Sequence, residues 1–176
     1  MAYTGRPAAG EFSAFYAGYV ARVPAGDIVA ILRDQLADTL SLFEPLAEAD
    51  AERPYAEGKW TLKQMLGHLA DTERVMAYRA LRIARGDTTP LPGFEENDYA
   101  RAAGSDARSV DDLRNELLTT RAATVALLAG LPAAAWERTG TASEATVSVR
   151  AIACIIAGHE LHHRAIIRTR YLDMEA

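Results

Sequence analysis

Two histidines, His159 and His163, lie four residues apart near the C-terminal end of the sequence. On an α-helix this spacing brings the two Cβ atoms to about 5–6 Å, so both imidazoles can reach one cation. The pair continues an apolar stripe that includes Ile156 and Ile166. Buried imidazoles need polar partners, and a bound metal ion would supply one. The pair therefore predicts two ligands of a metal site.

A third histidine, His68, precedes Thr72 by four residues and can point into the same core from another helix. A single inward histidine is more often a hydrogen-bonded core residue than a ligand, but a histidine pair on a facing helix reverses that preference. Three imidazoles suit zinc, nickel, copper or iron and leave one coordination position free. We therefore predict an open site for one divalent metal ion, held by His68, His159 and His163.

The segment 159–163 also matches H-E-x-x-H, the zinc-protease motif. The extended form of that motif needs a third ligand six residues after His163, where Thr169 stands, and only 13 residues follow His163. Glu160 lies about 100° around the helix from His159, which predicts a solvent-facing carboxylate. His162 lies about 100° from His163, which predicts a place at the bundle edge or behind the ligands. The protease interpretation is therefore rejected.

Other catalytic classes lack their residues. A di-iron carboxylate bundle needs two Glu-x-x-His pairs, and Met65 stands three residues before His68 where the second glutamate would be. The single cysteine, Cys154, lies in an apolar run and is predicted to be a buried small side chain rather than a reactive thiol. The sequence contains neither a nucleophile elbow nor a glycine-rich phosphate loop.

Length and composition favour one soluble domain. The chain has 176 residues, 49% of them hydrophobic, and a net charge of -5, which argues against a nucleic-acid surface. No apolar run approaches the ~20 residues needed to cross a bilayer, so no membrane partner is expected. The N-terminal residues do not resemble a signal peptide, and one cysteine allows no internal disulfide. A cytoplasmic location is the expectation.

The elements that must position the histidines are helices. Apolar residues recur at helical spacing in four segments, 27–47, 61–85, 109–130 and 148–172, whereas no stretch alternates as a strand would. Thr61 and Gln64 form a capping box at one helix start, and Ser109 is a cap at another. We predict an all-α four-helix bundle formed by one domain, 1–176. Residues 1–24 form an arm packed on it, with a short helix over 12–20.

The connection between the second and third helices, residues 86–108, is too long for a tight turn and is rich in turn residues. A link of this length can return along the bundle and let the two helices run parallel. It could also be a lid over a pocket, with Phe94 and Tyr99 pointing inward. The sequence supports a simple spanning role and a pocket-lining role equally.

Several blocks together resemble the DinB-like superfamily of metalloenzymes, in its DinB_2-type branch. The blocks are G-K-W-T at 58–61, G-H-L-A-D-T-E at 67–73, A-Y-R-A-L-R-I-A-R-G-D at 77–87 and A-G-H-E-L-H-H at 157–163. The resemblance spans about residues 26–172. It implies an up-down-down-up bundle, and a metal, usually zinc or nickel, held at positions that match His68, His159 and His163. It also implies a homodimer.

Relatives with known reactions include transferases that use bacillithiol or mycothiol, and a mycothiol-dependent isomerase. The resemblance therefore implies a metal-dependent thiol S-transferase acting on a small-molecule substrate, with a low-molecular-weight thiol as a further cofactor. A metal-dependent hydrolase is the alternative, and Asp71 and Glu73, near His68 in sequence, are its candidate general bases unless they form surface salt bridges. A third interpretation is a stress-linked, non-enzymatic binding module whose metal only braces the helices; a fourth protein ligand such as His162 would favour it.

Overall fold

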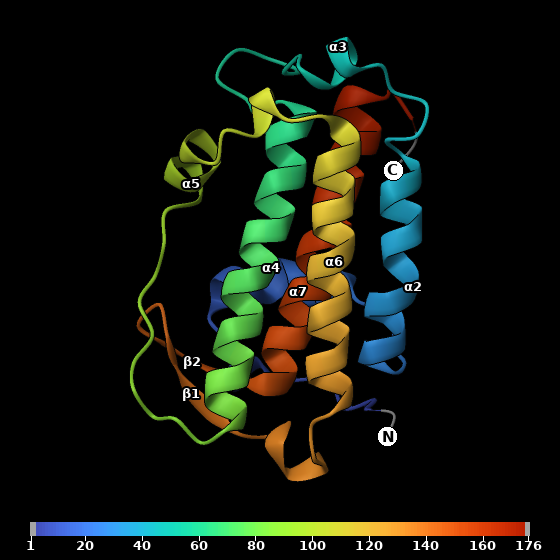
Figure 1. Cartoon of the computed structure of the whole chain (residues 1–176). Coiled ribbons are helices and arrows are strands. Elements are labelled where there is room, and N and C mark those ends of the chain that lie inside the picture. The colour runs from blue at the N-terminus through green and yellow to red at the C-terminus, as the bar shows by residue number, and fades with distance from the viewer. Residues whose placement is uncertain (1–2, 175–176) are drawn as a thin grey trace.

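The computed structural model describes residues 3–174, which form a bundle of four long helices. In chain order these helices run up, down, down and up along the bundle axis (Figure 1). The four are α2 (Ile28–Ser41), α4 (Leu62–Ala84), α6 (Val110–Ala129) and α7 (Val149–Ile166). The expected four-helix bundle and its up-down-down-up order are therefore confirmed.

Short elements complete the chain. The short helices are α1 (Ala17–Arg22), α3 (Glu48–Ala51) and α5 (Glu96–Ala102), with 3-10 turns at Ala9–Glu11, Ala14–Tyr16, Ser105–Ala107 and Ala133–Ala135 and a π-helical turn at Ile167–Tyr171. The arm helix is α1, five residues later than the expected start at 12. No helix in the described part of the chain is both long and apolar enough to cross a membrane.

Three of the long helices, α4, α6 and α7, begin at polar capping residues that the sequence predicts. Thr61 Oγ1 accepts a hydrogen bond from the Gln64 backbone N–H, and the Thr61 backbone N–H donates to Gln64 Oε1. The hydroxyls of Ser109 and Ser148 each accept from a backbone N–H in the first turn of the following helix. The end of the first long helix differs from its prediction. It stops at Ser41 rather than at 47, because Pro45 has no amide hydrogen and disfavours helical backbone in the residue before it.

A β-hairpin precedes α7, although no stretch of the sequence alternates as a strand would. Strands β1 (Thr139–Ala142) and β2 (Ala145–Ser148) pair antiparallel. Ser143 and Glu144 join them at φ of 50° and 63°, the positive values that a two-residue hairpin turn requires. Leu91 pairs with this hairpin through its amide and its carbonyl. The hairpin therefore fastens the long link to the start of α7.

The link 86–108 runs back along the outer side of α4, away from α6, and carries α5 (Figure 1). This path returns the chain to the end of the bundle where α4 begins, which is why α4 and α6 run parallel. Phe94 is half-buried and lines a cavity, whereas Tyr99 is 46% exposed. The expectation that both rings point inward is therefore correct only for Phe94.

The core consists of two apolar clusters separated by a polar layer. One cluster holds the ends of the helices nearest the hairpin, including Leu32, Met76 and Ile152. The other holds the opposite ends, including Leu66 and Leu117. Each helix passes from one cluster to the other at buried polar residues near its middle. These are Gln35 in α2, His68, Thr72 and Glu73 in α4, Thr120, Arg121 and Thr124 in α6, and His159, Glu160 and His163 in α7.

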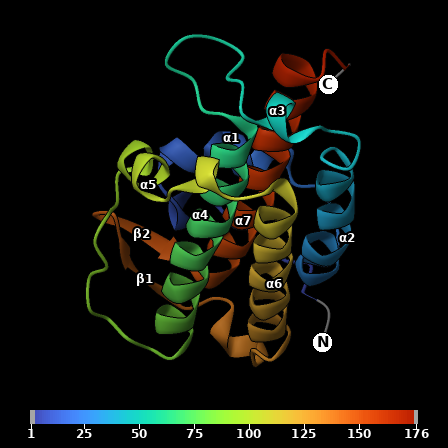
Figure 2. The same cartoon turned by 45° about the horizontal axis from the view of Figure 1, so that its top comes forward.

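The N-terminal arm packs against α7. The Arg6 guanidinium donates to the carbonyls of Val20 and Val23, and the Tyr3 ring stacks on Trp136 with centroids 4.4 Å apart. In the views of Figures 1 and 2, α1 lies behind α4 and α7. The arm therefore covers a face of α7 that would otherwise meet solvent.

An ion pair anchors the arm and should make its docking sensitive to acid. Arg150 Nε donates a hydrogen bond of 2.6 Å to the Glu11 carboxylate, and Ser148 Oγ donates one of 2.7 Å to the same carboxylate. These contacts, the Arg150 bond foremost, lower the pKa of Glu11 from 4.5 to about 2. A carboxyl whose pKa falls on folding stabilises the fold fully above its unfolded pKa, and this contribution disappears as pH drops from 4.5 toward 2.

We expect Glu11→Gln to lower the free energy of unfolding by about 1 kcal/mol at pH 7, the scale of a partly exposed pair. The difference from the unmodified protein should shrink to zero near pH 2. Urea unfolding at a series of pH values measures it, with Glu57→Gln at an exposed loop position as the control. A difference that stays constant from pH 7 to 2 would contradict this assignment.

Candidate metal centre

The polar layer brings together the three histidines that the sequence singles out. His68 lies on α4, and His159 and His163 lie one turn apart on the facing helix α7. His159 Nε2 is 2.9 Å from His68 Nε2 and 3.0 Å from His163 Nε2. The three side chains are 3%, 6% and 7% exposed, respectively for His68, His159 and His163. Among the described residues, this is the one group of three or more His, Cys, Asp or Glu side chains close enough to share an ion.

The three imidazoles cannot satisfy one another. A neutral imidazole nitrogen carries either one hydrogen or one lone pair in the ring plane. His159 Nε2 therefore satisfies at most one of its two close nitrogen neighbours, and the third ring nitrogen is left without a partner. A cation between the three atoms would accept a lone pair from each. His163 Nδ1 is also buried and has no hydrogen-bond partner in the described structure.

Burial keeps these rings neutral, which is the form that binds metal. It lowers the pKa of His68 to about 4. The pKa values of His159 and His163 fall well below 6.5, because the rings are buried and lie beside other histidines. The Thr72 hydroxyl lies 3.4 Å from His68 Nδ1 and can accept a hydrogen bond from an Nδ1–H group. In that tautomer Nε2 carries the lone pair, and it faces the other two rings.

The donor set fits a small divalent ion. Zinc–imidazole bonds of about 2.0–2.1 Å in a tetrahedral site place ligand nitrogens about 3.3 Å apart. The observed separations of 2.9 and 3.0 Å need to widen by only a few tenths of an ångström. His162 is not part of the group, as helical phase predicts, and its ring packs on Tyr19 with centroids 5.2 Å apart. Cys154 is buried and its pKa is raised to about 11 by burial, so it is the inert side chain expected.

A cavity of about 280 Å³ reaches His159. Its walls come from the arm, the link, the hairpin turn and the two histidine-bearing helices. They consist of Phe15, Tyr16, Tyr19, Thr72, Met76, Phe94, Glu95, Glu96, Ser143, Ile155 and His159. The link therefore contributes to the pocket wall in addition to spanning the bundle, and the arm contributes to it as well. A small molecule in this cavity would lie beside the histidine cluster.

The position of Glu160 corrects the sequence-based expectation. Instead of facing solvent it is 2% exposed, and its carboxylate lies 2.7 Å from the Arg121 guanidinium and bonds Gln35. Arg121 also donates two hydrogen bonds of 2.8 Å to Glu73 and one of 2.7 Å to the carbonyl of Leu32. One arginine thus connects all four long helices beside the metal centre.

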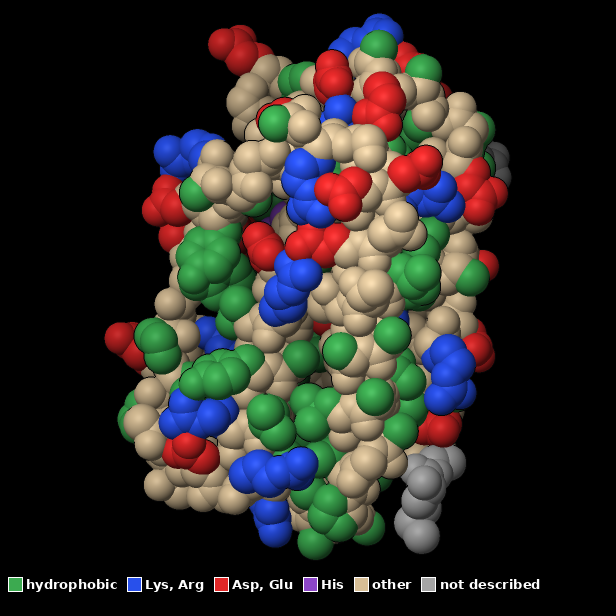
Figure 3. All heavy atoms as spheres, in the orientation of Figure 1, with side chains coloured by type: hydrophobic (Ala, Val, Ile, Leu, Met, Phe, Trp, Pro, Cys, Tyr) green, Lys and Arg blue, Asp and Glu red, His purple; other side chains and the backbone are tan. Residues whose placement is uncertain are grey.

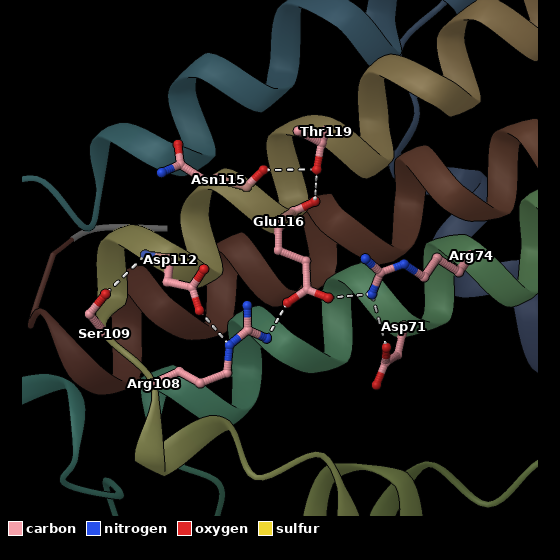
Figure 4. A network of polar contacts seen from close by, with 8 residues as sticks. All are labelled: Asp71, Arg74, Arg108, Ser109, Asp112, Asn115, Glu116 and Thr119. Carbon is pink, nitrogen blue, oxygen red and sulfur yellow. Dashed lines mark hydrogen bonds and ion pairs between the residues drawn. The ribbon is translucent and has the colours of Figure 1, made fainter.

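Neither candidate general base is free. Glu73 is engaged by Arg121. Asp71 lies 3.3 Å from Arg74, on the outer face of α4. Figure 4 shows Arg74 turned toward Glu116 of α6, which also pairs with Arg108 at the end of the link. Figure 3 shows acidic and basic side chains interspersed on the face that α4 and α6 present in Figure 1. Asp71 therefore belongs to the surface network that joins the link to the bundle.

Gly158 is a feature of the site that the sequence pattern did not single out. Gly158 allows the backbone of α1 to approach α7, because a Cβ there would lie 2.1 Å from the carbonyl oxygen of Tyr19. This approach places the Tyr19 ring 5.5 Å from the His159 ring, centroid to centroid. The glycine beside the first histidine of the pair was the available signal, because only glycine permits such a close backbone approach.

Comparison with known proteins agrees with this architecture. A curated relative from Geobacillus kaustophilus, described as a "putative metal-dependent hydrolase", is 27% identical over 148 residues, which cover 80% of this chain and 82% of the relative. A second relative with the same description, from Oceanobacillus iheyensis, is 32% identical over 56 residues, or 31% of this chain and 32% of its own.

Two solved structures share the fold. YfiT from Bacillus subtilis, described as a "probable metal-dependent hydrolase with an unusual four-helix bundle topology", has a TM-score of 0.72 at 19% identity, covering 84% of this chain and 87% of its own. The mycothiol-dependent maleylpyruvate isomerase has a TM-score of 0.68 at 16% identity, covering 83% of this chain and 61% of the isomerase. The DinB superfamily model matches residues 31–167, well over half of the sequence. The chain therefore belongs to the DinB superfamily.

Proposed function

We propose that this chain is a metal-dependent enzyme acting on a small molecule, with His68, His159 and His163 as the protein ligands of one divalent ion. The observation that carries the proposal is the convergence of three buried Nε2 atoms whose contacts no arrangement of ring protons satisfies. Zinc or nickel is the ion we propose first, because both accept imidazole ligands. The cavity at His159 gives a substrate access to the centre.

Hydrolysis is the reaction we propose. A divalent metal bound here would supply a Lewis acid that polarises a carbonyl and lowers the pKa of water. Thr72 orients the His68 imidazole, residues of the arm and the link line the cavity in which a substrate would lie, and Arg121 keeps the Glu73 and Glu160 carboxylates engaged. Thiol S-transfer, the first choice from the sequence, becomes the alternative, because both curated relatives are described as hydrolases. The three-histidine group leaves a position open, which supports an enzyme over a metal-braced binding module.

The metal assignment is tested by measuring bound metal in purified protein and in single histidine variants. We expect about one equivalent of metal in the unmodified protein and its loss in His68→Ala, His159→Ala and His163→Ala. His162→Ala is the matched control on the same helix and should retain the metal. Full metal content in the first three variants would overturn the assignment.

The reaction is tested on zinc-loaded protein with two panels. One contains activated esters and amides, and the other contains bacillithiol, mycothiol or glutathione with monochlorobimane. Hydrolysis that disappears in His163→Ala but persists in His162→Ala would support the proposed reaction. Turnover only in the thiol panel would replace it with S-transfer.

Thr72 should tune metal affinity through its contact with His68. Thr72→Val preserves shape but removes the hydroxyl that holds the imidazole tautomer, so we expect zinc affinity to fall by about tenfold. Competition with a chromophoric chelator measures the change. Thr120→Val removes another buried hydroxyl, one with no partner in the described structure, and should leave affinity unchanged. Equal zinc affinities of Thr72→Val and Thr120→Val would show that Thr72 does not orient the His68 imidazole.

A further inference from the structure

The cavity beside His159 has a consistent chemical character. Four of its lining side chains, Phe15, Tyr16, Tyr19 and Phe94, are aromatic. The first three pack against one another, with the Phe15 ring edge-on to both Tyr16 and Tyr19. Aromatic faces carry partial negative charge and attract cations, most strongly where water is excluded. The aromatic wall therefore offers a surface for an organic cation.

The charged side chains of the lining are both acidic. Glu95 and Glu96 line the cavity, and no lysine or arginine does. Glu95 caps α5 by accepting two hydrogen bonds of 3.1 Å from Asn97, through one carboxylate oxygen. Within residues 3–174, neither carboxylate forms an ion pair. Both charges are thus available to a ligand.

Burial and charge act together on one carboxyl group of the cavity. Partial burial and the charge of Glu95 raise the pKa of Glu96. The two carboxyl groups therefore lie close enough for each to experience the charge of the other.

A buried cation of the protein, Arg79, contacts two residues of the cavity wall. The Arg79 guanidinium lies over the Phe94 ring, 5.9 Å from its centroid, and donates to the Pro92 carbonyl and the Ser143 hydroxyl. It does not line the cavity. This contact shows that one aromatic ring of the wall already engages a cation. The rings of Phe15, Tyr16 and Tyr19, which also line the cavity, make no such contact with a cation among the described residues.

We infer that the cavity recognises a small molecule carrying an organic ammonium group, held between the arm's aromatic rings and the carboxylates of Glu95 and Glu96. The cation would lie near the mouth, with the rest of the molecule toward His159. This inference names a substrate class for the proposed function and rests on it for the orientation of the ligand. Recognition of the cation itself does not require the metal.

Three molecules of matched shape test the inference. Choline, its uncharged isostere 3,3-dimethylbutan-1-ol and the anion 3,3-dimethylbutanoate are titrated into purified protein by calorimetry, and metal content is measured on the same sample. We expect choline to bind about tenfold more tightly than the neutral isostere, and the anion to bind more weakly still. Equal binding of choline and the isostere, or no binding of choline, would overturn the inference.

Variants locate the recognition. Glu95→Gln combined with Glu96→Gln should remove most of the preference for choline over the isostere, and Phe15→Leu, at a 70% exposed position, should weaken choline more than the isostere. Asp98→Asn removes a charge from the same short helix but outside the cavity and should have no effect. A choline preference that the double variant leaves undiminished would place the cation elsewhere. If purified protein prefers choline but contains no metal, the metal centre is refuted and this inference stands. If it contains metal but does not prefer choline, this inference is refuted and the metal centre stands.

Discussion

Replacing Arg121 with methionine should lower the free energy of unfolding by about 3–5 kcal/mol, the usual cost of removing one partner from a buried ion pair. Arg121 is 2% exposed and is the counter-charge of both Glu73 and Glu160. Without it, two carboxylates would remain buried in the middle of the bundle, and Leu32 would lose a hydrogen bond to its carbonyl. Urea unfolding followed by circular dichroism measures the loss.

Two controls separate this effect from a general loss of charge. Arg53→Gln breaks an exposed pair with Asp50 and should change stability by less than about 1 kcal/mol. The triple variant Arg121→Met, Glu73→Met, Glu160→Met removes the whole charged group and should recover most of the stability, because apolar replacements of buried ion networks are often neutral or stabilising. A stability of Arg121→Met within 1 kcal/mol of the unmodified protein would contradict the assigned role.

Gly158→Ala should detach the N-terminal arm from α7. The added Cβ would lie 2.1 Å from the Tyr19 carbonyl oxygen and 2.4 Å from its carbon, and backbone atoms cannot rotate away as a side chain could. Relief requires α1 to move outward, and overpacking of this kind typically costs about 1–3 kcal/mol. We expect lower stability together with faster tryptic cleavage after Arg22, as the arm spends more time undocked.

Gly18→Ala is the matched control for this prediction. Gly18 lies on α1 itself, and a Cβ there meets no atom within 4 Å. Because alanine favours helix over glycine, this variant should be neutral or slightly more stable. The arm's aromatic rings line the cavity, so Gly158→Ala should also weaken any ligand held there. Unchanged proteolysis in Gly158→Ala would mean that the backbone accommodates the methyl group without moving the arm.

The sequence predicted the long helices and the histidine cluster because both depend on local rules. Helical spacing and caps set the element boundaries, and the four-residue spacing of His159 and His163 fixes their relative orientation on any helix. The return path of the link also followed from its length. These inferences required no knowledge of what packs outside the bundle.

The same helical reasoning was wrong for Glu160 because it assumed that α7 has a solvent face. That helix contacts α1, α2 and α4 together, and its residues from Ala151 to Glu160 are all buried. Glu160 turns toward α2 and α6, where Gln35 and Arg121 contact its carboxylate, and the N-terminal arm covers the face of α7 that carries Gly158. The hairpin escaped prediction for a different reason: its turn uses Ser143 and Glu144 rather than the Asn-Gly pair that usually marks such turns.

The polar layer also fixes how the helices align along the bundle axis. Apolar side chains alone tolerate sliding, because leucine or isoleucine packs in many positions. Here a one-turn slip of α6, about 5.4 Å, would carry Arg121 away from Glu73 and Glu160 and into an apolar cluster. Because the slip would leave buried charges without partners, it would cost much free energy. The charged group therefore selects one register. The apolar triple variant should therefore unfold less cooperatively and give poorly dispersed amide resonances, even where its stability recovers.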